Sequence, residues 1–130
     1  MRHRERRQSH RSRERAPPPP RARTLGEWIA SALLIANGYR ILARRHVTPY
    51  GEVDIIAARW DRVAFVEVKR RTTMDDAEAS LMPAQAARMA RAADYWLAHH
   101  PRYLQREVGL DAVLVTARGW PRHIPNALDL

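Results

Sequence analysis

Three ionisable residues in the middle of the chain, Asp54, Glu67 and Lys69, have types and spacing that could do chemistry. Side chains alternate across a β-strand, so Glu67 and Lys69, two residues apart, share one face of any strand that contains them. Carboxylate oxygens are ligands that Mg²⁺ or Mn²⁺ accepts, and a nearby lysine can touch a metal-bound water or a phosphate oxygen. Such a set is suited to metal-assisted hydrolysis of a phosphodiester.

Two apolar segments must position these residues. Residues 53–58 and 63–69 are rich in Val, Ile and Phe and read as two strands of a hairpin. If the connection is symmetric about Trp60 and Asp61, the numbers of paired residues sum to 121. Asp54 would then lie opposite Glu67. One face of this hairpin is wholly apolar and is expected to pack on a core.

The same register places Glu52 opposite Lys69, so four charged side chains would gather at one end of the hairpin. Directly opposed Cβ atoms lie about 4.5–5.5 Å apart, and two carboxylates at that distance repel each other. A cation between Asp54 and Glu67 would relieve the repulsion, and the backbone carbonyl of Val68 would offer a third oxygen. The sequence therefore predicts a Mg²⁺ or Mn²⁺ site, with Glu52 as its neighbour.

A plainer interpretation stays open, in which Glu67 and Lys69 form an exposed ion pair on a solvated sheet face. Against it stands the apolar character of both strands, because stray charges are costly in a central strand. Lys69 is also the only lysine among 23 basic residues, which favours a specific role for a compact charge with an adjustable pKa.

The remaining elements indicate an α/β fold with a mixed central sheet flanked by helices, in the order αβββαββ. Thr24 and Glu27 have the spacing of a capping box, in which Glu27 would serve as the second half. Gly109 is interpreted as a bulge in a late strand. The expected helices span residues 24–36 and 83–99, the further strands span 39–45, 108–116 and 122–124, and 72–80 is expected to be a loop or an irregular helix start.

Composition limits the classes of protein. The chain has 130 residues, a net charge of +9 and no cysteine, which excludes disulfides, zinc–thiolate sites and thiol nucleophiles. Residues 1–23 carry nine arginines and two glutamates, so we expect a disordered basic tail followed by a single domain over 24–130. No apolar run approaches the length of a membrane span, and no secretory signal is evident, so we expect a soluble cytoplasmic protein without a membrane partner.

An ordered set of motifs resembles the bacterial YraN family, within the PD-(D/E)xK nuclease superfamily. The resemblance covers about residues 24–128 and rests on Gly26-Glu27-xx-Ala30, Asn37-Gly38-Tyr39-x-Ile41-Leu42, Gly51-Glu52-Val53-Asp54-Ile55-Ile56, Phe65-Val66-Glu67-Val68-Lys69-x-Arg71, Asp111-Ala112-Val113 and His123-Ile124-x-Asn126-Ala127. Two positions depart from the family: Gln85 stands where a lysine is usual, and Gly109-Leu110 replaces an Arg-Phe pair before Asp111.

The resemblance implies a restriction-endonuclease-like fold and a metal-dependent endonuclease acting on DNA, including branched or repair DNA. It implies Asp54 and Glu67 as metal ligands, Lys69 as the catalytic lysine and Glu27 as an added acidic group. By analogy with nucleases of branched DNA, a homodimer is also expected.

Nucleic-acid contacts are expected from Arg71, Gln85 and Arg88, because arginine and amide side chains commonly bind phosphates. A solvated helix edge explains Arg88 equally well, and a residue such as Gln85 is more often simply solvated on a helix. Two other functions also remain open. One is a non-catalytic nucleic-acid-binding module that keeps the fold, and the other is a scaffold that binds a partner through the basic tail.

Overall fold

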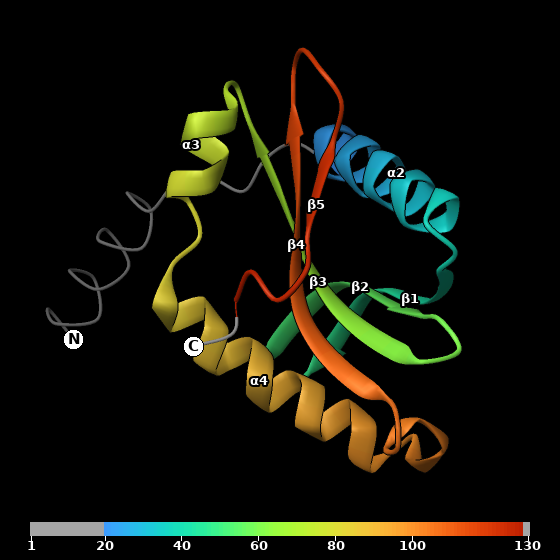
Figure 1. Ribbon diagram of the computed structural model, residues 1–130. Coiled ribbons are helices and arrows are strands. Elements are labelled where there is room, and N and C mark those ends of the chain that lie inside the picture. Colours follow the sequence, from blue (N-terminus) through green and yellow to red (C-terminus); the bar gives the residue numbers. More distant parts are fainter. Residues whose placement is uncertain (1–19, 129–130) are drawn as a thin grey trace, which may run out of the picture.

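The computed structural model describes residues 20–128 (Figure 1). None of the helices in this range is long and apolar enough to cross a membrane. In chain order the elements are α2 (Pro20–Ala36), β1 (Arg40–Thr48), β2 (Gly51–Ala58), β3 (Arg62–Arg71), α3 (Met74–Ala79), α4 (Pro83–Ala98), a 3₁₀ turn η1 (Pro101–Tyr103), β4 (Glu107–Thr116) and β5 (Arg122–Ile124).

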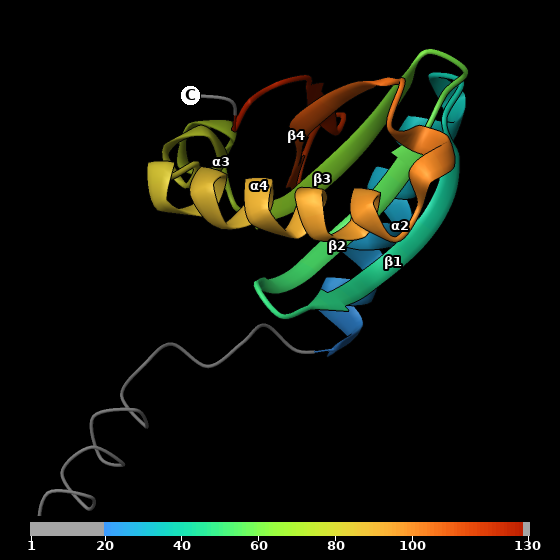
Figure 2. The same cartoon turned by 90° about the horizontal axis from the view of Figure 1, so that it is seen from below.

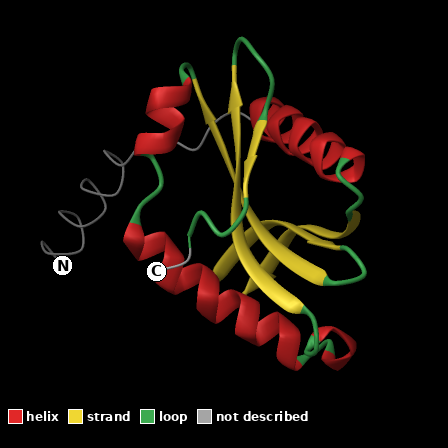
Figure 3. Cartoon of the chain, viewed as in Figure 1, coloured by secondary structure: helices red, strands yellow, loops and turns green. Residues whose placement is uncertain are grey.

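The strands form one mixed sheet in the order β1-β2-β3-β4-β5. Neighbouring strands run antiparallel, except for β3 and β4, which are parallel. Parallel neighbours need a long crossover, and α3, α4 and η1 supply it (Figure 3). The expected mixed sheet with flanking helices is thus confirmed.

The short helix α3 falls where a loop or an irregular helix start was expected. Its first turn is stabilised locally, because the Thr73 side chain accepts a hydrogen bond from the backbone N–H of Asp76. Asp75 and Asp76 add negative charge at the positive end of the helix. Ala77 is fully buried against Ala112 and Leu114 of β4, so α3 covers the end of the parallel pair.

Helices cover both faces of the sheet, with α4 crossing one face and α2 lying on the other (Figure 2). The wholly apolar face of the hairpin packs on a core, as expected, and α2 covers it at Ile55, Ala57, Ala64 and Val66. The other face packs Ile56, Ala58, Val63 and Phe65 against α4 near the turn, and Val53 joins this second cluster. Regular alternation along the strand would place Val53 with Ile55, so its place in the second cluster departs from that pattern beside Asp54.

The first helix begins at Pro20, four residues before the expected start at Thr24. Proline is favourable at the first position of a helix, because the N–H that it lacks would have no partner there. Thr24 therefore lies inside the helix, and the predicted capping box with Glu27 is wrong. The expected tail over residues 1–23 also ends earlier, since residues 20–23 belong to α2, while residues 1–19 lie outside the described range.

The hairpin between β2 and β3 has the predicted register over its first half. Pairing runs from Ala58↔Val63 to Ile55↔Val66, and the Arg59 N–H donates to the Arg62 carbonyl at 2.8 Å across the turn at Trp60 and Asp61. The ladder ends at Ile55↔Val66. The predicted direct pairs of Asp54 with Glu67 and of Glu52 with Lys69 are therefore absent from the ladder.

Candidate functional site

Asp54 lies at the point where β2 and β3 separate. Its carboxylate oxygen Oδ2 accepts a hydrogen bond from the backbone N–H of Val68 at 2.8 Å. A side chain thus takes the place of the next backbone pairing, and the carboxylate is inserted between the strands. This divergence avoids the direct opposition of two carboxylates, which is unfavourable in a regular antiparallel pair. Asp54 is held on a backbone whose neighbours, Val53 and Ile55, are fully buried.

The pKa of Asp54 is raised to about 7. Burial is the main cause, since it disfavours the charged form, and the negative charge of Glu67 is the next. Glu27 and Glu52 raise this pKa further, whereas the hydrogen bond from Val68 lowers it. Negative charge is therefore concentrated around Asp54, and a bound cation would relieve it.

Glu67 lies between two cations. Its oxygen Oε1 is 3.2 Å from the Lys69 ammonium, and Oε2 is 3.7 Å from the Arg88 guanidinium. The side chains of Glu67 and Lys69 are 12% and 10% exposed, so this pair is not the solvated surface pair of the plainer interpretation. The structure brings Glu67 and Lys69 together, as their spacing in the strand predicts.

Arg88 ties helix α4 to both strands of the site. One of its nitrogens approaches Glu67, and the other donates to the Glu52 backbone carbonyl at 3.2 Å. Gly51 makes room for this guanidinium, because a Cβ at Gly51 would lie 2.5 Å from Arg88 Nη1. Its φ of +118° is also one that residues with a side chain rarely adopt. Arg88 thus holds α4 against β2 and β3 beside Glu67.

Glu27 affects the site electrostatically, since its negative charge raises the pKa of Asp54. It is 7% exposed, and both of its carboxylate oxygens accept from Arg45 Nε, at 2.7 and 2.8 Å. The same guanidinium donates to the Thr24 hydroxyl at 2.8 Å. Arg45 therefore draws both residues of the supposed capping box into contacts with β1, which is the physical reason that the local prediction is wrong.

The other expected contact residues differ in their surroundings. Gln85 lies one turn before Arg88 on α4, and its side-chain oxygen is buried without a hydrogen-bond partner. Arg71 follows Lys69 on the same face of β3, where one of its nitrogens donates to the Arg70 carbonyl at 2.7 Å. Glu52 pairs with Val47 of β1 rather than with Lys69 of β3.

The ligands available for a metal are few. Within residues 20–128, no group of three or more His, Asp or Glu side chains is arranged to hold a metal ion. Asp54 and Glu67 interact through their charges, since Glu67 raises the pKa of Asp54, and Val68, the residue of the expected third oxygen, anchors Asp54 through its N–H. Mg²⁺ commonly keeps several waters and takes one or two carboxylates together with substrate phosphates, so a two-carboxylate set fits this ion.

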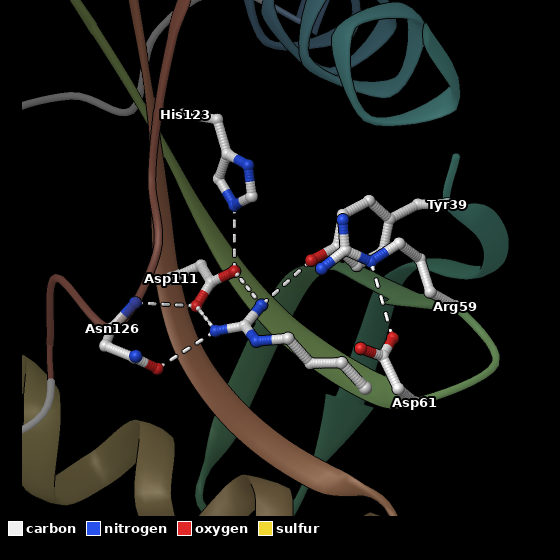
Figure 4. Close-up of polar contacts among 7 residues, drawn as sticks. Tyr39, Arg59, Asp61, Asp111, His123 and Asn126 are labelled. Carbon is white, nitrogen blue, oxygen red and sulfur yellow. Dashed lines mark hydrogen bonds and ion pairs between the residues drawn. The ribbon is translucent and has the colours of Figure 1, made fainter. Parts of the chain in front are cut away.

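A second polar cluster surrounds Asp111 of β4, which pairs with Val66 on the face of the sheet that packs on α2 (Figure 4). Arg62 donates to both oxygens of Asp111, at 2.6 and 2.7 Å, and one of its nitrogens also donates to the Tyr39 hydroxyl at 3.1 Å. His123 lies 2.8 Å from Asp111, and the backbone N–H of Asn126 donates to the same carboxylate at 2.9 Å. These contacts join β3, β4 and the residues in and after β5.

This cluster holds its charges buried. Asp111 is fully buried and Arg62 is 5% exposed. Burial alone would raise the pKa of Asp111, but the hydrogen bonds from Arg62 and His123 lower it to about 2. The bond to Asp111 in turn raises the pKa of Arg62. A buried ion pair whose hydrogen bonds are all made favours one packing of the strands. Removing only one of its two partners is strongly destabilising, because the other charge stays buried without a partner.

Sequence reasoning gave Asp111 and His123 no role of their own and did not include Arg62 among the candidates. The signal available was Gly109, which was interpreted as a bulge. That prediction is wrong, because β3 and β4 pair without interruption through Ala64↔Gly109. Gly109 instead leaves space for Arg62, since a Cβ at this position would overlap the Arg62 guanidinium.

Comparisons with known proteins give one consistent result. Residues 26–115 match the model of the "Uncharacterised protein family UPF0102". A "UPF0102 protein" of Bradyrhizobium sp. strain BTAi1 is 52% identical over 100 residues, which cover 77% of this chain and 74% of the relative. Those of Rhodopseudomonas palustris strain BisB18 and Nitrobacter winogradskyi are each 50% identical over 100 residues, which cover 77% of this chain and 74% and 85% of the relatives, respectively.

Proposed function

This chain is a member of the UPF0102 family, the YraN family of the sequence resemblance, and we propose that it is a metal-dependent nuclease that hydrolyses DNA phosphodiester bonds. The proposal includes a restriction-endonuclease-like arrangement of the mixed sheet. It also includes DNA as the partner, with branched or repair DNA among the substrates. Cytoplasmic location and a homodimer are further parts of the same proposal.

The observation that carries the proposal is the convergence of Asp54, Glu67 and Lys69 where β2 leaves β3. Asp54 is anchored by the Val68 N–H, and its pKa responds to the charge of Glu67. Lys69 is 3.2 Å from Glu67. A pair of mutually repelling carboxylates with an adjacent buried ammonium is costly for a protein that gains nothing from it.

Each residue has a role that follows from its position. Asp54 and Glu67 would hold Mg²⁺ or Mn²⁺, which supplies Lewis-acid stabilisation of a phosphate and a more acidic bound water. The ammonium of Lys69 would orient the attacking water or a phosphate oxygen. Arg88 would bind a phosphate from the α4 side, and its contact with the Glu52 carbonyl holds it in place.

The test is cleavage of linear duplex, single-stranded and branched DNA by the purified chain with Mg²⁺ or Mn²⁺. Asp54→Asn and Lys69→Ala should each lower cleavage by at least about 100-fold, a size typical of lost metal or acid–base catalysis. Asp94→Asn, an exposed aspartate on α4, is the matched control and should keep full activity. Undiminished cleavage by Asp54→Asn and Lys69→Ala would refute the assigned roles.

One observation favours a second function, a nucleic-acid-binding module without catalysis. Both oxygens of Glu67 already face cations, from Lys69 and Arg88, so this part of the cluster is neutralised by the protein itself. Calorimetric titration with Mn²⁺ separates the two functions. A nuclease predicts binding that Asp54→Asn removes, whereas the module predicts no binding of the ion and DNA affinity that falls with salt.

A further inference from the structure

The loop between β4 and β5 presents an exposed aromatic side chain. Trp120 is 89% exposed, although Trp is usually well buried. The neighbouring Gly119 has a φ of +93°, and a Cβ built there would meet no atom within 4 Å. Figure 1 shows the loop standing clear of the helices at the top of the molecule. Within residues 20–128, contacts with the fold cover little of this large indole.

The register of the sheet places this loop beside the candidate site. Lys69 on β3 pairs with Leu114 on β4, which in turn pairs with Arg122 on β5. Paired residues point to the same face, so the side chains of Lys69 and Arg122 lie on one face, two strand spacings or about 10 Å apart. Trp120 precedes Arg122 by two residues. The loop that carries Trp120 therefore begins beside Arg122, a few nucleotides from a phosphate bound at Lys69.

Arginines surround the loop on the side of the site. Arg71 pairs with Thr116 at the end of β4, and the exposed Arg118 follows two residues later. In the described part of the chain, neither Arg71 nor Arg118 forms an ion pair with a carboxylate, whereas Arg122 binds Glu78 at 2.6 Å. An exposed indole beside unpaired guanidinium groups is complementary to a base next to its phosphates.

The other highly exposed tryptophan provides a contrast within the same fold. Trp60 is 86% exposed at the β2–β3 turn, at the opposite end of β3 from Lys69. The carboxylate of Asp61 follows it directly and lies 3.7 Å from the Arg59 side chain. The Trp60 indole is thus exposed beside an arginine that is already paired with a carboxylate, and it lies away from the site. The two loops differ in their charges and positions, not in the exposure of their indoles.

We propose that Trp120 stacks on an unpaired base of a nucleic acid whose phosphates contact Arg71 and Arg118. This inference rests on the proposed function of the site at Asp54, Glu67 and Lys69, and it names the substrate class. The substrate is DNA that offers an unpaired base a few nucleotides from the bond to be cleaved, as single strands, flaps and branches do. A fully paired blunt duplex, whose bases are already stacked, gains nothing from Trp120.

Binding without metal tests this inference separately from catalysis. Fluorescence anisotropy with a labelled single-stranded oligonucleotide and a blunt duplex, both in EDTA, measures affinity when no cleavage occurs. Trp120→Ala should weaken binding of the single strand by about 5- to 150-fold, the range for loss of one stacked base. Trp120→Phe should retain most of the affinity, and duplex binding should change little. Trp60→Ala is the matched control and should bind like the parent.

Several outcomes would overturn the inference: parental affinity of Trp120→Ala, an equal loss with Trp60→Ala, or an equal loss for duplex and single strand. A change in sedimentation of Trp120→Ala without a change in DNA affinity would instead assign the loop to a protein contact, and would also overturn it. Failure of the nuclease proposal looks different. The chain would then bind single strands through Trp120 but cleave no DNA with Mg²⁺ or Mn²⁺.

Discussion

Replacing Asp54 by asparagine should make the metal-free protein more stable at alkaline pH. The fold holds this carboxyl at a pKa of about 7, whereas an unfolded aspartate titrates near 3.8. Because the folded pKa is raised, the folded state binds the proton more tightly than the unfolded state. The folded state is therefore penalised progressively as pH rises from about 4 to about 7, and the full penalty remains above that range.

The size of the effect follows from the pKa. A rise from 3.8 to about 7 corresponds to at most about 4 kcal/mol of lost stability at pH 8. Relaxation of the folded state and entry of water reduce this value, so we expect a gain of about 1–3 kcal/mol for Asp54→Asn. Asparagine keeps an oxygen that can accept from the Val68 N–H, and its amide can donate toward Glu67.

Thermal unfolding of the metal-free protein in EDTA at several pH values measures the gain. For a domain of this size, 1 kcal/mol moves Tm by about 4 °C, so Asp54→Asn should unfold about 4–12 °C above the parent at pH 8. Near pH 4 the two proteins should differ little. Asp94→Asn, at an exposed position of α4, should show no comparable trend. A gain that is the same at pH 4 and pH 8, or no gain at pH 8, would refute the argument.

Three further predictions concern the second polar cluster and its neighbours. Arg62→Met should lower the free energy of unfolding in urea by about 3–5 kcal/mol, because it leaves Asp111 buried without its main partner. Arg122→Ala removes an exposed ion pair and should lower it by less than about 1 kcal/mol. Equal effects would contradict the burial argument. Because the pKa of Asp111 is lowered to about 2, the stability that its carboxylate contributes is complete above about pH 4 and is lost as pH falls toward 2. Asp111→Asn should therefore flatten the dependence of the unfolding free energy on pH in that range. An unchanged slope would count against this role of Asp111. Gly109→Ala should destabilise the fold by at least about 2 kcal/mol, because the new methyl group would displace Arg62. Gly26→Ala, whose new methyl group would lie 3.7 Å from Arg70 Cδ, should stabilise the fold by about 0.5–1 kcal/mol, since alanine favours a helix over glycine. Calorimetric Tm values of the two variants check this difference in sign.

Local patterns were sufficient for much of the fold. The period of apolar residues predicts α4 and the three central strands, since side-chain direction in a helix or strand is a local property of the backbone. The two-residue turn at Trp60 and Asp61 could be predicted for the same reason. Local patterns misplaced the start of α2, because Thr24 and Glu27 have the spacing of a capping box. In the structure both side chains contact Arg45 of β1 instead.

The amino-acid sequence by itself determined that Glu67 and Lys69 share a face of one strand, because alternation along a strand needs no knowledge of its neighbours. It also determined the register of the pairs nearest the turn, from Ala58↔Val63 to Ile55↔Val66. Only the tertiary structure decided that β2 leaves β3 at Asp54, that α4 places Arg88 beside Glu67, and that Arg62 and Asp111 are buried together. These contacts join segments far apart in the chain, and their energies depend on burial and on which charges meet, which no local period of residues encodes.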